Sequence, residues 1–162
     1  DELAADAKVI NSFTLSHETN HQLDFNAGLL DRAGDVPLCI SEGLAAYGET
    51  WRLNPHVPIG RVNWPRLKGR GKAPWIRLEQ LLSEDNLLDD EASRNAAYAQ
   101  SWVLIHYFMI DSTRTPKLRA YLAAIKPRRD PSHRLEDARA HFGDLDVLDK
   151  HLRRYALNPK GP

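Results

Sequence analysis

The stretch that most constrains this chain is His17-Glu18-Thr19-Asn20-His21, which has the form HExxH. Residues four apart on an α-helix lie on one face, with Cβ atoms about 5–6 Å apart. The imidazoles of His17 and His21 can therefore reach one metal ion at the roughly 2.0–2.1 Å typical of zinc–nitrogen bonds. Apolar residues at a spacing of three to four around the motif predict a helix that turns both histidines inward.

A third ligand is available in Glu42, which lies 21 positions after His21 in a Ser-Glu-Gly-Leu-Ala run. Asp35 and Pro37 predict the start of a second helix, with Glu42 in its second turn on a mainly apolar element. An acid in that setting needs a partner. We therefore expect the two helices to face each other at Glu42.

Together, His17, His21 and Glu42 would form a His2Glu site for Zn2+ that leaves a fourth position open for water. Glu18 is rotated by about 100° from His17 on the helix, which places its carboxylate beside the metal as a general base. The sequence thus predicts a zinc-dependent hydrolase. The alternative is that the two histidines are ordinary core or surface residues.

The motifs His17-Glu-Thr-Asn-His-Gln-Leu-Asp-Phe-Asn-Ala-Gly28 and Ser41-Glu-Gly-Leu-Ala-Ala-Tyr47 resemble the gluzincin clan, the thermolysin-like zinc metallopeptidases. More narrowly, they resemble an uncharacterised bacterial peptidase-like family. The resemblance is strong over residues 12–50 and fainter to about residue 110. It implies a zincin-like catalytic domain that cleaves peptides or proteins outside the cytoplasm, secreted or periplasmic.

By the same resemblance, His17, His21 and Glu42 are the zinc ligands and Glu18 is the catalytic acid/base. The chain departs from the pattern in two places. Thermolysin has a supporting aspartate four residues after the glutamate ligand, where this chain has Ala46, so support is expected from Glu49, Asp35 or a backbone carbonyl. Gluzincins also usually carry a β-sheet before the HExxH helix, and the few residues that precede it here are compatible with a fragment of a longer chain.

Composition predicts one domain over residues 1–162. Lysine plus arginine and aspartate plus glutamate balance at 22 each, so no net charge favours nucleic acid or an anionic membrane. The single cysteine excludes an internal disulfide. No apolar run approaches the roughly 18–20 residues of a membrane span. The oligomeric state stays open.

The expected fold is mainly α. Helices are predicted over about 1–10, 12–26, 37–51, 78–82, 93–110, 115–126, 132–142 and 145–157, from apolar periodicity and from Pro and Gly boundaries. The helix at 93–110 is apolar nearly all round, which predicts deep burial. Residues 55–77 are rich in Pro and Gly and predict a loop or a short β-ribbon.

This Pro/Gly-rich segment is basic. Seven Lys and Arg and no acid lie between Thr50 and Leu78, with three tryptophans among them. A nucleic-acid surface is one interpretation. We favour the wall of a substrate cleft, because the next stretch holds six acids and no base between Glu79 and Glu91 and can offset this charge.

Further candidates each have an ordinary structural alternative. Tyr98 would donate to the oxyanion that forms during carbonyl attack, or would be a core side chain with a hydrogen-bonded tip. His106 and His56 are lone histidines, and Cys39 is better explained as a small buried residue than as a ligand. The competing hypothesis for the whole chain is an inactive zinc-binding module that serves as an interaction or structural part of a larger protein.

Overall fold

The computed structural model describes the backbone of residues 2–50 and 60–161, with side chains from residue 12 onward within those ranges. Its helices are α1 (Glu2–Asn26), α2 (Leu38–Gly48), α3 (Trp64–Gly69), α4 (Leu78–Ser83), α5 (Arg94–Met109), α6 (Thr115–Ile125), α7 (Arg134–Phe142) and α8 (Leu145–Leu157). Two short 3-10 turns, η1 (Asp85–Leu88) and η2 (Pro131–His133), complete the regular structure. No strand occurs in the described ranges, so the prediction of a mainly helical fold is confirmed.

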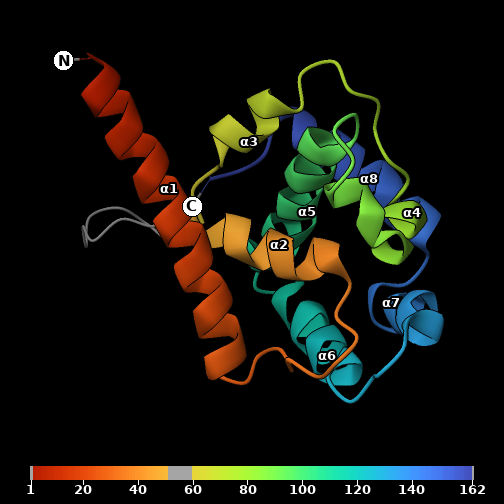
Figure 1. Ribbon diagram of the computed structural model, residues 1–162. Coiled ribbons are helices and arrows are strands. Elements are labelled where there is room, and N and C mark those ends of the chain that lie inside the picture. The colour runs from red at the N-terminus through yellow and green to blue at the C-terminus, as the bar shows by residue number, and fades with distance from the viewer. Residues whose placement is uncertain (1, 51–59, 162) are drawn as a thin grey trace.

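Helix α5 is the centre of the molecule, as its apolar sequence predicts. Trp102, Leu104 and Ile105 have no exposed surface. Helices α2, α3, α6 and α8 and the turn η1 all pack on it (Figure 1). Because a helix that is apolar on every side must be enclosed, this arrangement follows from the composition of α5.

Helix α2 lies between α5 and α1, and two glycines allow both close approaches. A Cβ atom on Gly43 would lie 2.5 Å from the backbone oxygen of Ser101 on α5. A Cβ atom on Gly48 would lie 2.1 Å from the side-chain amide of Asn20 on α1. Both approaches are shorter than real Cβ contacts, so a side chain at Gly43 would collide with the backbone of α5, and one at Gly48 would have to displace the side chain of Asn20. Helix α1 forms the edge of the molecule and packs mainly on α2 (Figure 1).

An ion cluster around the buried side chain of Arg134 holds the start of α2, and we call it the arginine cluster: Arg134, Asp35 and Asp85. Arg134 donates to both carboxylate oxygens of Asp35 at 2.7 Å and to those of Asp85 at 3.0 and 2.9 Å. Asp85 also accepts the backbone N–H of Leu38 at 2.9 Å, which satisfies a donor in the first turn of α2.

The loop or β-ribbon predicted for residues 55–77 is wrong over residues 64–69, where the chain forms α3. The side chain of Asn63 accepts the backbone N–H of Arg66 at 3.2 Å and caps the helix. Pro65 falls in the first turn, where a missing N–H costs nothing. The proline-rich part at residues 55–59 lies outside the described residues.

The remaining helices match their predicted positions to within a few residues. The expected lead-in at 1–10 is continuous with the HExxH helix and forms the first part of α1. Asp144 caps α8 by accepting the N–H of Val147 at 3.0 Å. Within the ranges that the structure describes, no helix combines the length and the apolar character needed to cross a bilayer.

Candidate metal centre

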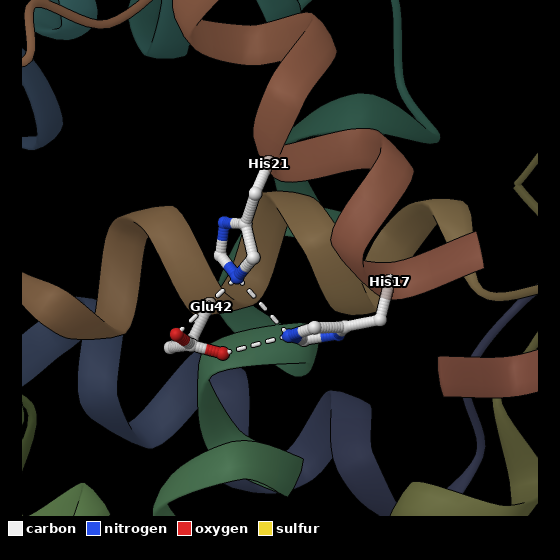
Figure 2. A group of neighbouring side chains, drawn as sticks. All are labelled: His17, His21 and Glu42. Atoms are coloured by element: carbon white, nitrogen blue, oxygen red, sulfur yellow. Dashed lines mark hydrogen bonds and ion pairs between the residues drawn. The ribbon is translucent and has the colours of Figure 1, made fainter. Parts of the chain in front are cut away.

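The two histidines of HExxH and Glu42 meet where α1 crosses α2, and we call this group the histidine cluster. His17 Nε2 lies 3.0 Å from Glu42 Oε2, and His21 Nε2 lies 3.4 Å from Glu42 Oε1. The two histidine Nε2 atoms are 3.1 Å apart (Figure 2). The i, i+4 spacing on α1 and the close packing at Gly48 produce this convergence, which the sequence predicted.

The spacing of the ligand atoms in the histidine cluster suits a zinc ion. Ligands at about 2.0–2.1 Å in a tetrahedral site are separated by about 3.3–3.4 Å from one another. The separations of 3.0 to 3.4 Å in the histidine cluster are close to that value. Two imidazoles and one carboxylate are also a ligand set that zinc enzymes use, so the residues present fit the ion.

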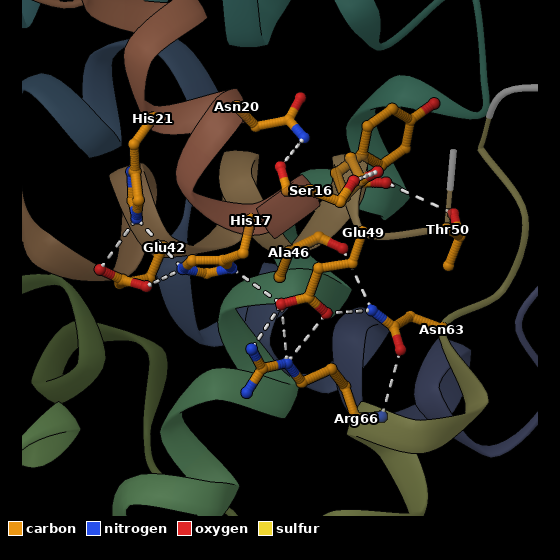
Figure 3. A network of polar contacts seen from close by, with 12 residues as sticks. Ser16, His17, Asn20, His21, Glu42, Ala46, Glu49, Thr50, Asn63 and Arg66 are labelled. Atoms are coloured by element: carbon orange, nitrogen blue, oxygen red, sulfur yellow. Dashed lines mark hydrogen bonds and ion pairs between the residues drawn. The ribbon is translucent and has the colours of Figure 1, made fainter. Parts of the chain in front are cut away.

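Glu49 fixes the orientation of His17. Its Oε1 atom lies 2.7 Å from Nδ1 of His17, and the carboxylate is buried (Figure 3). A proton on Nδ1 is therefore shared with Glu49, which directs the lone pair of Nε2 into the cluster. Of the three expected sources of support, the structure brings Glu49 to the histidine, whereas Asp35 belongs to the arginine cluster.

Glu49 is in turn held by residues around the start of α3. Asn63, which is fully buried, donates to Glu49 Oε2 at 2.7 Å and to the carbonyl of Ala46 at 3.1 Å. Arg66 Nε donates to the two carboxylate oxygens at 3.2 and 3.0 Å, and Nη2 also contacts Oε1 (Figure 3). Neither Asn63 nor Arg66 was predicted as part of the site from the sequence. The Asn-Trp-Pro start of α3 was the available signal, because Asn before Trp-Pro is typical of a helix N-terminus.

When no metal is bound, the pKa of His17 is raised and the pKa of Glu42 is lowered relative to the free side chains. Burial opposes a charge on His17, but its hydrogen bonds to Glu42 and Glu49 outweigh this and raise its pKa to about 9. Burial also opposes ionisation of Glu42, yet its hydrogen bonds to His17 and His21 lower its pKa to about 2. A divalent cation would replace the Nε2 proton of His17, while Nδ1 would stay protonated toward Glu49.

Glu18 lies outside the histidine cluster, as its position on the helix predicts. It is exposed and borders an open cleft of about 630 Å3 between α1 and α3. We call this the α1–α3 cleft, and it is lined by Phe13, Thr14, His17, Glu18, Glu49, Pro65, Arg66, Gly69, Asn95 and Tyr98. The cleft therefore brings Glu18, one ligand histidine and part of the basic segment onto one surface.

Tyr98 enters the same cleft from α5. Its ring centroid lies 6.3 Å from that of His17. Burial and the interaction with Glu42 raise the pKa of Tyr98 to about 12, so the phenol stays protonated and can donate. Tyr98 thus lines the cleft beside His17, and its role as an oxyanion donor stays a prediction.

The other sequence candidates lie away from the histidine cluster. Cys39 is completely buried in the apolar core. His106 is enclosed in the core as well, where its Nδ1 and Nε2 atoms lie 2.7 Å from Tyr155 Oη and 2.8 Å from the carbonyl of Gly60. Both of its nitrogens are thus satisfied, which accounts for its burial. His56 lies outside the described residues.

Comparison with curated proteins and with solved structures finds no significant match. A family model matches residues 11–131. That span includes the histidine cluster, Glu18, Glu49, Arg66 and Tyr98. The matching model is described as a protein of unknown function, DUF1570, and the chain belongs to this family.

Proposed function

We propose that this protein is a zinc-dependent hydrolase, and that it is a metallopeptidase of the gluzincin type with a zincin-like helical domain. The observation that carries the proposal is the convergence of two HExxH imidazoles and one carboxylate within 3.0 to 3.4 Å, beside a cleft that Glu18 borders. The choice of peptide bonds as substrate rests on the resemblance to gluzincins, as does a location outside the cytoplasm.

His17, His21 and Glu42 would hold the ion. Bound zinc supplies Lewis acidity, which makes water reactive near neutral pH and polarises a carbonyl oxygen. Glu18 takes a proton from the attacking water and returns it to the leaving amine, so the carboxylate is unchanged at the end of the cycle. Tyr98 donates a hydrogen bond to the carbonyl oxygen as negative charge develops there.

Replacement of the general base tests this assignment. We expect Glu18→Gln to lower peptide turnover by about 10²–10⁴-fold, since that is the usual contribution of a positioned acid/base group. Zinc content should be unchanged, because Glu18 is not a ligand. Turnover would be measured by mass spectrometry on a mixed peptide library, with the exposed residue change Glu91→Gln as the matched control. Full activity in Glu18→Gln would contradict the assignment.

One observation favours a second candidate, an inactive zinc-binding module. Gluzincins bind extended substrate along a sheet edge, and residues 2–50 and 60–161 contain no strand. An exposed Glu18 beside the histidine cluster argues for catalysis instead, because a structural site has no need of a general base and usually has four protein ligands.

A further inference from the structure

Arg66 contacts two different parts of the candidate site. On one side its guanidinium holds both oxygens of Glu49, the carboxylate that orients His17. On the other side its central carbon lies 4.6 Å from the centroid of the Tyr98 ring. The guanidinium of Arg66 therefore contacts both Glu49, which supports a predicted metal ligand, and Tyr98, the expected oxyanion donor.

The chemistry of this position is particular to arginine. A guanidinium presents five N–H donors in a rigid plane, so it can hold a carboxylate with two of its nitrogens while its face stacks on an aromatic ring. Lysine has a point charge and can do only one of these well. Asn63 fixes the backbone from which Arg66 projects, because it caps α3 and also donates to Glu49.

The ion pair between Arg66 and Glu49 is shielded from solvent on the side of Glu49. The side chain of Glu49 is 3% exposed and that of Arg66 is 31% exposed. A buried carboxylate without its cationic partner is expected to repack or to draw the His17 proton more closely, and either change would turn the imidazole. Loss of the guanidinium face would also free the Tyr98 ring to rotate in the cleft.

We propose that Arg66 is a positioning residue that orients His17 through Glu49 and Tyr98 through stacking, so that both face the same metal centre. The part that concerns Tyr98 rests on the proposed function. The part that concerns His17 requires only that the histidine cluster binds a metal.

Zinc affinity tests the first part without any turnover. The zinc dissociation constant would be measured by competition with a chromophoric chelator in Arg66→Ala and Arg66→Lys, with Lys68→Ala as control. Lys68 lies on the same helix and is exposed. We expect about a 10-fold loss of affinity in Arg66→Ala, a smaller loss in Arg66→Lys and none in the control. Visible absorption of the Co2+-substituted proteins should change in the same order.

A double-mutant cycle shows whether Arg66 acts through Glu49. If it does, Arg66→Ala should cost little further zinc affinity in a Glu49→Gln background, because the carboxylate it positions is already altered. Equal zinc affinity in wild type and Arg66→Ala, with both folded by circular dichroism, would overturn the proposal. Additive losses in the double variant would do so too.

Kinetics test the second part. Arg66→Ala should lower kcat more than it changes KM, and this loss should shrink in a Tyr98→Phe background. An equal loss of kcat with and without the Tyr98 hydroxyl would refute the stacking role. A wild-type protein that binds zinc and cleaves no peptide would instead refute the proposed function, and the affinity measurements would still decide the role of Arg66 at His17.

Discussion

Helix α2 is flanked by two clusters of charged and polar side chains, and the carboxylates in the two clusters have different kinds of partner. In the arginine cluster, Arg134 lies between Asp35 and Asp85 and donates four hydrogen bonds at 2.7 to 3.0 Å. In the histidine cluster, the Nε2 atoms of His17 and His21 lie 3.1 Å apart, and each faces one carboxylate oxygen of Glu42 at 3.0 and 3.4 Å. The arginine cluster contains its own cation. In the histidine cluster, the only positive charge among the ligand atoms is the proton on a histidine.

Burial and polarity alone therefore do not identify a functional site. Each cluster has a buried side chain at its centre, Arg134 or His17, and each links distant parts of the chain. What differs is whether the positive charge is permanent, as on Arg134, or is a proton on His17 that a metal ion can replace. Where it is permanent, the cluster stabilises the fold, and where lone pairs converge without a fixed cation, a metal ion is the natural partner.

The largest expected difference between the two clusters is the response of the histidine cluster to a metal chelator. Dialysis against EDTA should remove zinc and reduce peptidase activity to background, while far-UV circular dichroism stays unchanged, because protonated His17 can pair with Glu42 and Glu49 in the metal-free protein. Added zinc should restore activity. Unfolding on chelation would instead identify a structural zinc site and favour the inactive module.

Loss of the cation from the arginine cluster should have the opposite effect. Arg134→Met leaves two carboxylates without their partner, so we expect the free energy of unfolding to fall by about 3–5 kcal/mol. Urea denaturation would measure it, with Arg139→Met, a half-exposed arginine, as the control. Zinc content per folded chain should not change. A loss of zinc in Arg134→Met would mean that the two clusters are not independent.

Next in size is the pH dependence of the metal-free protein. The pKa of His17 is about 9 in the fold against 6.5 for free histidine, so its stabilising contribution is complete below pH 6.5 and is lost as the pH rises through 9. The pKa of Glu42 is about 2 against 4.5, so its contribution is present above pH 4.5 and is lost as the pH falls toward 2. Metal-free stability should therefore decrease by roughly 3 kcal/mol between pH 6.5 and pH 10.

Urea denaturation of the EDTA-treated protein at these two pH values measures this change. His17→Gln is the control, since it has no imidazole to titrate and should lose most of the difference. A metal-free protein that became more stable toward pH 10 would contradict the proton arrangement described for the histidine cluster.

The smallest effect is expected at an exposed ion pair. Arg77 lies 3.3 Å from both Glu79 and Asp146, but its side chain is 63% exposed, so solvent screens both contacts. Arg77→Ala should change the free energy of unfolding by less than about 0.5 kcal/mol. Thermal unfolding followed by circular dichroism is sufficient to measure it. A loss comparable to that of Arg134→Met would show that exposure is a poor guide to the importance of an ion pair in this fold.

Much of the fold could be predicted from the sequence, because helical periodicity and Pro and Gly boundaries are local signals. The burial of α5 followed from its uniform apolar character. Helix α3 was missed because the Pro and Gly content of residues 55–77 predicts a loop, although a proline in the first turn of a helix, such as Pro65, is well tolerated. The helix forms there because Asn63 caps its first turn, and a cap from one residue in a short segment is a weak signal in the sequence.

The histidine cluster was predicted because HExxH places its ligands by helix geometry alone. Glu49 was one of three expected supports, and the sequence could not choose among them because the choice depends on where α2 ends relative to α1. Arg66 could not be predicted from its surroundings in the sequence. Its contacts join α3, α5 and the residue that follows α2, which come together because α2 and α3 both pack on α5.

Metal content is the most direct test of the claim that the histidine cluster binds zinc. Elemental analysis would be applied to purified wild type, His21→Ala and Glu42→Ala, each first shown to be folded by circular dichroism. We predict about one zinc per chain in the wild type and little or none in either variant. A folded wild-type protein that holds no zinc, even after incubation with the metal, would contradict the account.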